Sequence, residues 1–298
     1  MKITKLDRKY RGIVLIILSA LFFAAMSMLV RLSGDLPVLQ KCFFRNAVAL
    51  LVATVLLVRK GYGFRPTHRE NLPWLLTRAC FGTISTLCNF YAVDQLLLAD
   101  ASILNKMSPF FAVIISALLL KEKLSPLQGF TLAGAFVGAL CIVKPTLSNM
   151  NLIPALVGLT SGFCAGVGFT LVRLLGQRGE KNSYIVFVFS AVSCAATLPK
   201  LLFDFTPMTW QQVVCLVCAG ACAAVGQFCV TGAYGYAPAR EISVYDYSQV
   251  IFSATMGFFL FGDVPDRYSV LGYFLICGMA VLNFWYSTRY LPRKQAKE

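Results

Sequence analysis

Ten apolar stretches, each about as long as a membrane-spanning helix, occupy almost the whole of this chain. A helix needs about 20 residues to cross the hydrocarbon of a bilayer. The stretches are Gly12–Ser33, Val38–Val58, Leu72–Val93, Ala99–Leu120, Leu127–Val143, Ile153–Leu175, Tyr184–Phe203, Gln211–Ala233, Ile242–Phe261 and Tyr268–Thr288. Short connections rich in Gly and Pro separate them and leave no room for a soluble domain. The sequence therefore predicts an all-α integral membrane protein with ten transmembrane helices.

Composition excludes a water-soluble fold. Only 13% of the residues are charged and the mean hydropathy is +0.70, whereas soluble domains carry about 25% charged residues. Most of the 11 cysteines lie within apolar stretches, and the single histidine, His68, lies in a distant loop. A zinc site needs four ligands around one point. We therefore expect the cysteines to be small buried side chains, and we expect neither a metal nor any other cofactor.

The basic residues predict the orientation in the membrane. The first apolar stretch is too long for a cleavable signal, so we expect it to be retained as a helix. With the N-terminus in the cytoplasm, 19 of the 27 Lys and Arg residues fall on the cytoplasmic side and five on the other. This bias predicts a protein of the cell (plasma or inner) membrane with both termini in the cytoplasm. It also explains most of the net charge of +14 without a nucleic-acid partner.

The chain repeats itself at a nearly constant interval. Leu29–Gly34 returns as Leu171–Gly176, and a shift of 141 residues places the following residues on like residues: Ala92 on Ala233, Asp100 on Glu241, Ser102 on Ser243, Phe111 on Phe252 and Glu122 on Asp263. Chance similarity between two apolar helices would not also align the charged residues at their ends. We predict two five-helix repeats, residues 1–145 and 146–298. Because five is odd, the second repeat would be inverted, an arrangement typical of secondary transporters.

A set of short patterns supports a family resemblance over essentially the whole chain. They are Phe43-Phe44-Arg45-Asn46, Ala99-x-x-Ser102, Ser108-Pro109-Phe110, Leu118 to Ser125, Gly129 and Gly134, with second copies at Ala237-Pro238-Ala239, Ser243 and Phe259 to Asp263. As a set they resemble the EamA-type permeases of the drug/metabolite transporter (DMT) superfamily. The resemblance implies a ten-helix, inverted-repeat transporter of small molecules. It leaves the substrate open among amino acids, nucleosides, organic anions and drugs.

The second repeat departs from the first at two positions. Val250 stands where the first repeat has Pro109, and Asp263 stands where the family usually has glutamate. We therefore expect the two halves to bend differently. Asp263 and Glu122 are expected to cap helix ends on opposite sides of the membrane and to hold loop contacts.

Polar side chains recur on single faces of several predicted helices, which suggests helices that line one wet cavity. The candidate substrate-binding residues are Arg45, Arg78, Ser85, Asn89, Tyr91, Asn105, Lys106, Gln227, Tyr245, Asp246 and Gln249. Alternatives stay open for several of them. Small residues on these faces serve close helix packing equally well, as we expect for the ridge Gly158–Gly166. Arg78 could snorkel to the cytoplasm, Arg45 could clamp backbone carbonyls, and the tyrosines could form an interfacial belt.

Lys106 and Asp246 are the most informative of these residues. Ionisable groups inside a membrane are costly and point to function. The repeat shift places Asn105 on Asp246 and Lys106 on Tyr247, so both positions should face the cavity from opposite sides. We expect Asp246 to balance Lys106 or Arg78, and to be the residue through which protons would couple to transport. The excess of basic groups predicts an anionic or zwitterionic cargo.

These observations predict a secondary active transporter that moves a small metabolite by alternating access. No Walker-type loop is present, so ATP is not the energy source. Clusters of catalytic residues at a membrane face are also missing, so we do not expect an enzyme. An exporter of drugs or nucleoside-like solutes and a non-transporting scaffold or sensor are the alternatives. The expected partners are the bilayer and the substrate, with a homodimer left open.

Overall fold

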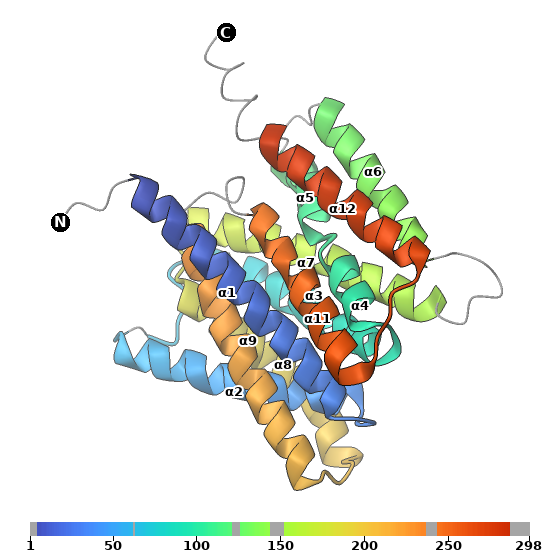
Figure 1. The fold of residues 1–298 in the computed structure, drawn as a ribbon. Helices are drawn as coiled ribbons and strands as arrows, with labels where there is room; N and C mark the ends of the chain where they lie inside the picture. Colours follow the sequence, from blue (N-terminus) through green and yellow to red (C-terminus); the bar gives the residue numbers. More distant parts are fainter. Residues whose placement is uncertain (1–4, 62, 121–125, 144–151, 237–242, 287–298) are drawn as a thin grey trace.

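The computed structural model describes residues 5–61, 63–120, 126–143, 152–236 and 243–286, and in these ranges helices joined by short connections are the only regular secondary structure (Figure 1). Glu122, the Ala237-Pro238-Ala239 element and the boundary between the predicted repeats lie outside these ranges. The elements are α1 Lys5–Leu32, α2 Val38–Arg59, η1 Arg69–Asn71, α3 Leu72–Gln95, α4 Leu98–Asn105, α5 Ser108–Leu120, α6 Pro126–Val143, α7 Leu152–Gln177, α8 Asn182–Phe203, α9 Trp210–Tyr236, η2 Ser243–Tyr247, α11 Ser248–Phe261 and α12 Arg267–Trp285.

Six of the described helices are long and apolar enough to cross a membrane. These spans are Tyr10–Leu32, Val38–Arg59, Leu152–Gln177, Asn182–Phe203, Trp210–Val230 and Arg267–Trp285. The predicted span Ala99–Leu120, which we expect to bend at Pro109, is divided by the structure into α4 and α5 just before that proline. The stretch that ends at Phe261 is likewise a short 3-10 helix, η2, followed by α11. Both breaks matter for the site described below.

The helices pack in pairs that recur when the two halves of the chain are exchanged. α1 packs along α9 as α3 packs along α7, and α2 contacts α9 as α3 contacts α8 (Figure 1). α5 contacts α7 as α1 contacts α11. Two further pairs, α2 with α8 and α6 with α12, join equivalent helices of the two halves. Each of these packing pairs therefore has a counterpart in which helices of the first half of the chain are exchanged with helices of the second half.

Equivalent polar contacts tie both ends of the α2/α8 pair. At one end, the Gln40 side chain donates to Thr206 O at 2.8 Å and accepts from Thr206 N at 3.1 Å. At the other end, the Glu180 carboxylate accepts from Thr67 N, Thr67 Oγ1 and Asn71 Nδ2 at 2.8–3.2 Å. These contacts satisfy buried polar groups that would otherwise be costly. They join the ends of α2 to the ends of α8.

We expect the substitution Glu180→Ala to lower the free energy of unfolding by about 1–3 kcal/mol at pH 7, because the buried amide of Asn71 and the part-buried donors of Thr67 lose their acceptor. Burial acts to raise the pKa of Glu180, but hydrogen bonds from Asn71, Thr67 and Lys181 outweigh it and hold this pKa below the ordinary 4.5. A pKa lower in the folded than in the unfolded state stabilises the protein above about pH 4.5, and that stabilisation is lost as the pH falls through the folded-state value.

Denaturant unfolding of the purified protein in detergent, at pH 7 and at pH 3.5, measures both effects. The difference between wild type and Glu180→Ala should shrink at the lower pH. Glu70→Ala is the matched control, since Glu70 is an exposed carboxylate of the same loop region. An equal loss of stability in both variants would contradict this role of Glu180.

Candidate functional site

The two interrupted helices meet at their breaks. Lys106 is the residue that follows α4, and Asp246 lies in η2 just before α11. Lys106 Nζ is 2.6 Å from Asp246 Oδ2, and both side chains are largely buried. The Tyr247 hydroxyl donates to the Lys106 carbonyl oxygen at 3.0 Å. The expected ion pair between Lys106 and Asp246 is therefore present, at the contact between the two halves of the chain.

Local sequence explains the first break. Pro109 has no N–H to donate to the Asn105 carbonyl, and its ring disfavours helical geometry at the preceding residue. The backbone instead forms i to i−3 hydrogen bonds from Met107 N to Leu104 O and from Phe110 N to Met107 O. Pro109 then occupies the first turn of α5, where proline is well tolerated.

The second break falls at the equivalent position although no proline is there. A shift of 141 residues carries Lys106 and Met107 onto Tyr247 and Ser248, where η2 gives way to α11. The two halves bend differently, as expected. The first half has a turn between α4 and α5, and the second half has the 3-10 helix η2 before α11. The position of the break is nevertheless the same in both halves.

Three buried polar contacts join α4 to α11 and η2 along their whole length, and we call them the α4/α11 seam. The first is the Lys106–Asp246 ion pair. Ser102 Oγ lies 2.7 Å from Ser253 Oγ in the middle of the seam. At the far end, Asp263 Oδ2 accepts from Leu98 N, the first residue of α4, at 3.0 Å.

Asp263 also binds α1 into the far end of the seam. Arg31 approaches its two carboxylate oxygens at 2.5 and 3.1 Å. Gly262 makes this possible, because its left-handed backbone (φ 68°) turns the chain so that Asp263 N returns to Gly257 O at 3.1 Å. The expected capping role of Asp263 is thus present, while Glu122 lies outside the described residues.

Close packing of α7 holds the first break in place. A Cβ on Gly162 would lie 2.5 Å from Leu104 O and 3.2 Å from Asn105 O, and one on Gly166 would lie 2.7 Å from Ser108 O. Only glycine lets two backbones approach so closely. The ridge Gly158–Gly166 is therefore a packing seam, as its spacing predicted.

Arg45 and Arg78 lie deeper between α2, α3 and α8. Both are buried, and their guanidinium carbons lie 5.7 and 4.9 Å from the centre of the Phe189 ring. Arg78 does not snorkel to solvent, and Arg45 donates to Asn46 Oδ1 at 2.5 Å, with no clamp on a backbone carbonyl among the described residues. No carboxylate in the described part of the chain forms an ion pair with either.

Some of the remaining predicted site residues contact neighbouring helices. Asn105 and Ser85 are engaged with α7, since Asn105 Nδ2 donates to Ser161 Oγ at 2.8 Å and Ser85 Oγ to Ser161 O at 2.9 Å. Tyr245 packs edge-on against Phe284, 6.3 Å between ring centres. The others are buried or half-buried on the helices expected to carry them: Asn89 and Tyr91 on α3, Gln227 on α9 and Gln249 on α11.

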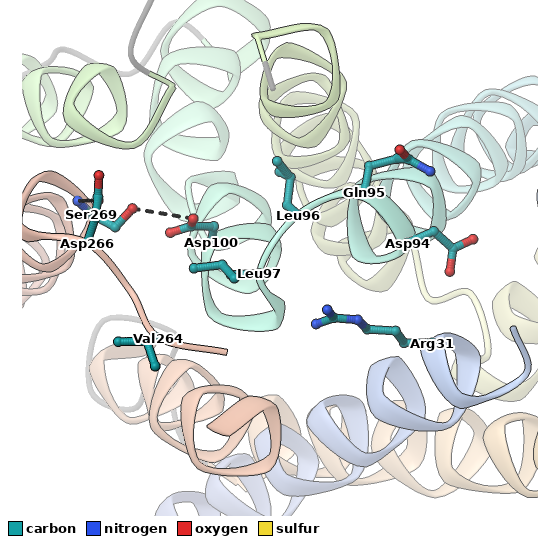
Figure 2. A pocket seen from close by; sticks show the side chains of 9 residues that line it. All are labelled: Arg31, Asp94, Gln95, Leu96, Leu97, Asp100, Val264, Asp266 and Ser269. Atoms are coloured by element: carbon teal, nitrogen blue, oxygen red, sulfur yellow. Dashed lines mark hydrogen bonds between the residues drawn. The ribbon is translucent and has the colours of Figure 1, made fainter. Parts of the chain in front are cut away.

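Sequence reasoning missed a pocket of about 330 Å³ beside the far end of the seam, which we call the Asp100 pocket (Figure 2). It is lined by Arg31, Asp94, Gln95, Leu96, Leu97, Asp100, Val264, Asp266 and Ser269. Asp100 accepts from Tyr273 Oη at 2.6 Å and Ser269 Oγ at 3.3 Å, and Lys41 Nζ lies 2.7 Å from both carboxylate oxygens of Asp94. The sequence did contain a signal for this pocket. Asp94, Asp100 and Asp266 cluster around two connections that are predicted to lie on the same side of the membrane.

Comparison with known proteins identifies the family. The model of the EamA-like transporter family matches twice, at residues 10–144 and 152–285. The chain is 34% identical to the pseudopaline exporter CntI of Pseudomonas aeruginosa over 91% of its own length and 95% of the relative's. It is 24% identical to a riboflavin transporter of Brucella anthropi, over 87% and 93%, and 23% identical to human solute carrier family 35 member G1, over 93% and 80%.

A solved crystal structure superimposes with a TM-score of 0.64 at 16% identity, over 93% of this chain and 99% of the other, which shows a shared fold. Together with the apolar helices, these matches establish a multi-pass membrane protein that is a transporter and not an enzyme. The chain belongs to the EamA-like transporter family of the drug/metabolite transporter superfamily.

Proposed function

We propose that this transporter moves an anionic or zwitterionic small metabolite by alternating access around the Lys106–Asp246 pair. The observation that carries the proposal is a buried ion pair where the break between α4 and α5 meets η2, the 3-10 helix that leads into α11. Secondary transporters place their substrate and coupling sites where discontinuous helices of two repeats meet near the middle of the bilayer. A transported group that binds Lys106 or Asp246 would compete directly with the contact that closes the α4/α11 seam.

The proposal includes ten membrane crossings in two inverted repeats, residues 1–145 and 146–298. Support comes from the packing pairs that recur when the halves are exchanged and from breaks 141 residues apart. With both termini in the cytoplasm of the cell, the Arg31–Asp263 end of the seam faces outward, so this structure is closed on its outer side. A homodimer is not needed for this scheme, since one chain supplies both halves of the site.

The named relatives support a small-molecule cargo and favour export. The relative at 34% identity is an exporter of pseudopaline, and a more distant one transports riboflavin. Arg45, Arg78 and Lys106 are all buried, and Asp246, beside Lys106, is the only carboxylate among the described residues that pairs with any of the three. This excess supports a cargo that brings negative charge into the membrane interior.

Flux into proteoliposomes tests the proposal directly. The purified protein is reconstituted and presented with a panel of radiolabelled amino acids, dicarboxylates and nucleosides. Saturable flux of an acidic or zwitterionic compound is the expected result. Flux confined to nucleosides or to neutral drugs would favour the alternative cargo, and absence of flux and of binding across the panel would overturn the proposal for these classes.

Asp246 is also the proposed coupling residue. Its Oδ1 atom is buried and lacks a hydrogen-bond partner, so it is available to a proton or to a cationic group of the cargo. We expect Asp246→Asn to abolish uphill transport while sparing exchange down a gradient, because asparagine cannot carry a proton on and off. Flux is measured with and without a pH gradient, with Thr255→Ala, an exposed position on the same helix, as control. Wild-type pH dependence in Asp246→Asn would count against coupling through this residue.

A further inference from the structure

Arg45 and Arg78 stand apart from the other cations named above. Lys41 pairs with Asp94, Lys106 with Asp246 and Arg31 with Asp263. Arg45 and Arg78 are 5% and 7% exposed, yet no carboxylate among the described residues pairs with either. The Nε atom of each is buried without a hydrogen-bond partner. Two buried guanidinium groups are thus left with the face of a phenyl ring and one amide oxygen.

These contacts do not compensate the two buried positive charges. A charge removed from water is costly unless it is paired and hydrogen-bonded. The Phe189 ring attracts both cations, at 5.7 and 4.9 Å from its centre, but an aromatic face offsets only part of that cost. Two like charges beside the same ring also repel each other. An oxyanion bound between the two guanidinium groups would pair their charges, accept their free hydrogen bonds and offset their mutual repulsion. Arginine forms especially strong, bidentate hydrogen bonds to such groups.

Arg78 and the first helix break both lie close to α7. A Cβ placed on Gly168 of α7 would be 3.6 Å from the Arg78 side chain, and one placed on Gly162 of the same helix would be 2.5 Å from Leu104 O and 3.2 Å from Asn105 O. Six residues of α-helix separate these glycines, which is about 9 Å along the axis. Arg78 and the helix break that carries Lys106 are therefore neighbours along one helix, which puts the arginine pair close to the proposed transport site.

We infer that Arg45 and Arg78 form an anion subsite of the transport pathway and that the cargo presents two negative charges to it. The chemistry that fits is a pair of carboxylates or a phosphate group. Arg45, Arg78 and Lys106 against Asp246 leave two uncompensated positive charges in the buried part of the site, so a dianion restores neutrality. This inference rests on the proposed function and specifies the substrate class of the same site.

Ligand-induced thermal stabilisation of the full chain in lipid nanodiscs tests the inference without requiring transport. The probes are succinate, inorganic phosphate and acetate at matched ionic strength. We expect succinate or phosphate to raise the Tm at concentrations at least tenfold lower than acetate does. The more effective of the two identifies paired carboxylates or a phosphate as the recognised chemistry. Equal effects of all three probes would overturn the inference on wild-type protein alone.

Variants then locate the subsite. Arg45→Gln and Arg78→Gln should each weaken the response to the dianion at least tenfold, and Arg45→Lys and Arg78→Lys keep the charge if the glutamine variants do not fold. Arg59→Gln, on the exposed last turn of α2, is the control and should respond as wild type. A wild-type response in the Arg45 and Arg78 variants would overturn the assignment. If the dianion binds but is not transported, the proposed function is refuted. If the flux is the same in wild type and in the Arg45 and Arg78 variants, only this inference is refuted.

Discussion

Asp246→Ala is expected to lower the free energy of unfolding by about 3–5 kcal/mol, the cost of leaving a buried charge without its partner. Lys106 Nζ is 2.6 Å from Asp246 Oδ2, and Asp246 is the only partner that the described residues give this ammonium group. The variant should also lose transport, because Lys106 would no longer be paired with the carboxylate that it contacts between the two halves of the chain. Chemical unfolding in detergent and flux in proteoliposomes measure the two effects separately.

A double-mutant cycle distinguishes the ion pair from general disruption. Lys106→Met in the Asp246→Ala background should recover much of the lost stability, because replacing both members of a buried pair by apolar groups is often neutral. Transport should remain absent. The exposed pair Lys200 and Asp204 is the matched control, and Asp204→Ala should cost about 0–1 kcal/mol. Additive losses in the cycle would show that Lys106 and Asp246 do not interact in the folded protein.

Gly162→Val is expected to destabilise the protein by about 3 kcal/mol or more, beyond the range usual for overpacking. Its first added carbon would lie 2.5 Å from Leu104 O and 3.2 Å from Asn105 O, and both are backbone atoms at the helix break that cannot rotate away. We expect α7 to separate from α4, which would also displace Lys106. Thermal unfolding and flux measure the outcome.

The same helix supplies the control for this steric argument. Gly176 has no atom within 4 Å of an added Cβ, so Gly176→Ala should leave stability unchanged or raise it slightly, since alanine favours helix formation. Comparable losses in Gly162→Val and Gly176→Ala would mean that the loss reflects substitution of any glycine in α7 and not the close approach at the break.

The sequence repeat was sufficient to bring Lys106 and Asp246 together. The two residues are 140 positions apart, but a repeat shift of 141 places both next to the same equivalent position, so their contact could be predicted without coordinates. Apolar periodicity cannot show where a helix is interrupted, which is why Ala99–Leu120 was predicted as one span that bends at Pro109 and not as two helices.

Side-chain direction was less predictable than position. Ser85 and Asn105 lie on faces that the spacing predicted to be polar, yet both donate to Ser161 of α7. A helical face is broad, and whether it meets a cavity or a neighbouring helix depends on tertiary packing. The shared contact of Arg45 and Arg78 with Phe189 was unpredictable for the same reason, because Phe189 lies in the other repeat and carries no polar signal.

The central claim is that the α4/α11 seam must open for transport. Ser102 and Ser253 face each other across it with their Oγ atoms 2.7 Å apart, close enough for a disulfide between cysteines at these positions. Ser102→Cys and Ser253→Cys are introduced together into a variant that lacks the 11 native cysteines. Flux of the best substrate in the proteoliposome panel is then measured after oxidation and again after reduction. The account predicts that the cross-linked protein is inactive and that reduction restores flux, whereas unchanged flux through the cross-linked protein would contradict it.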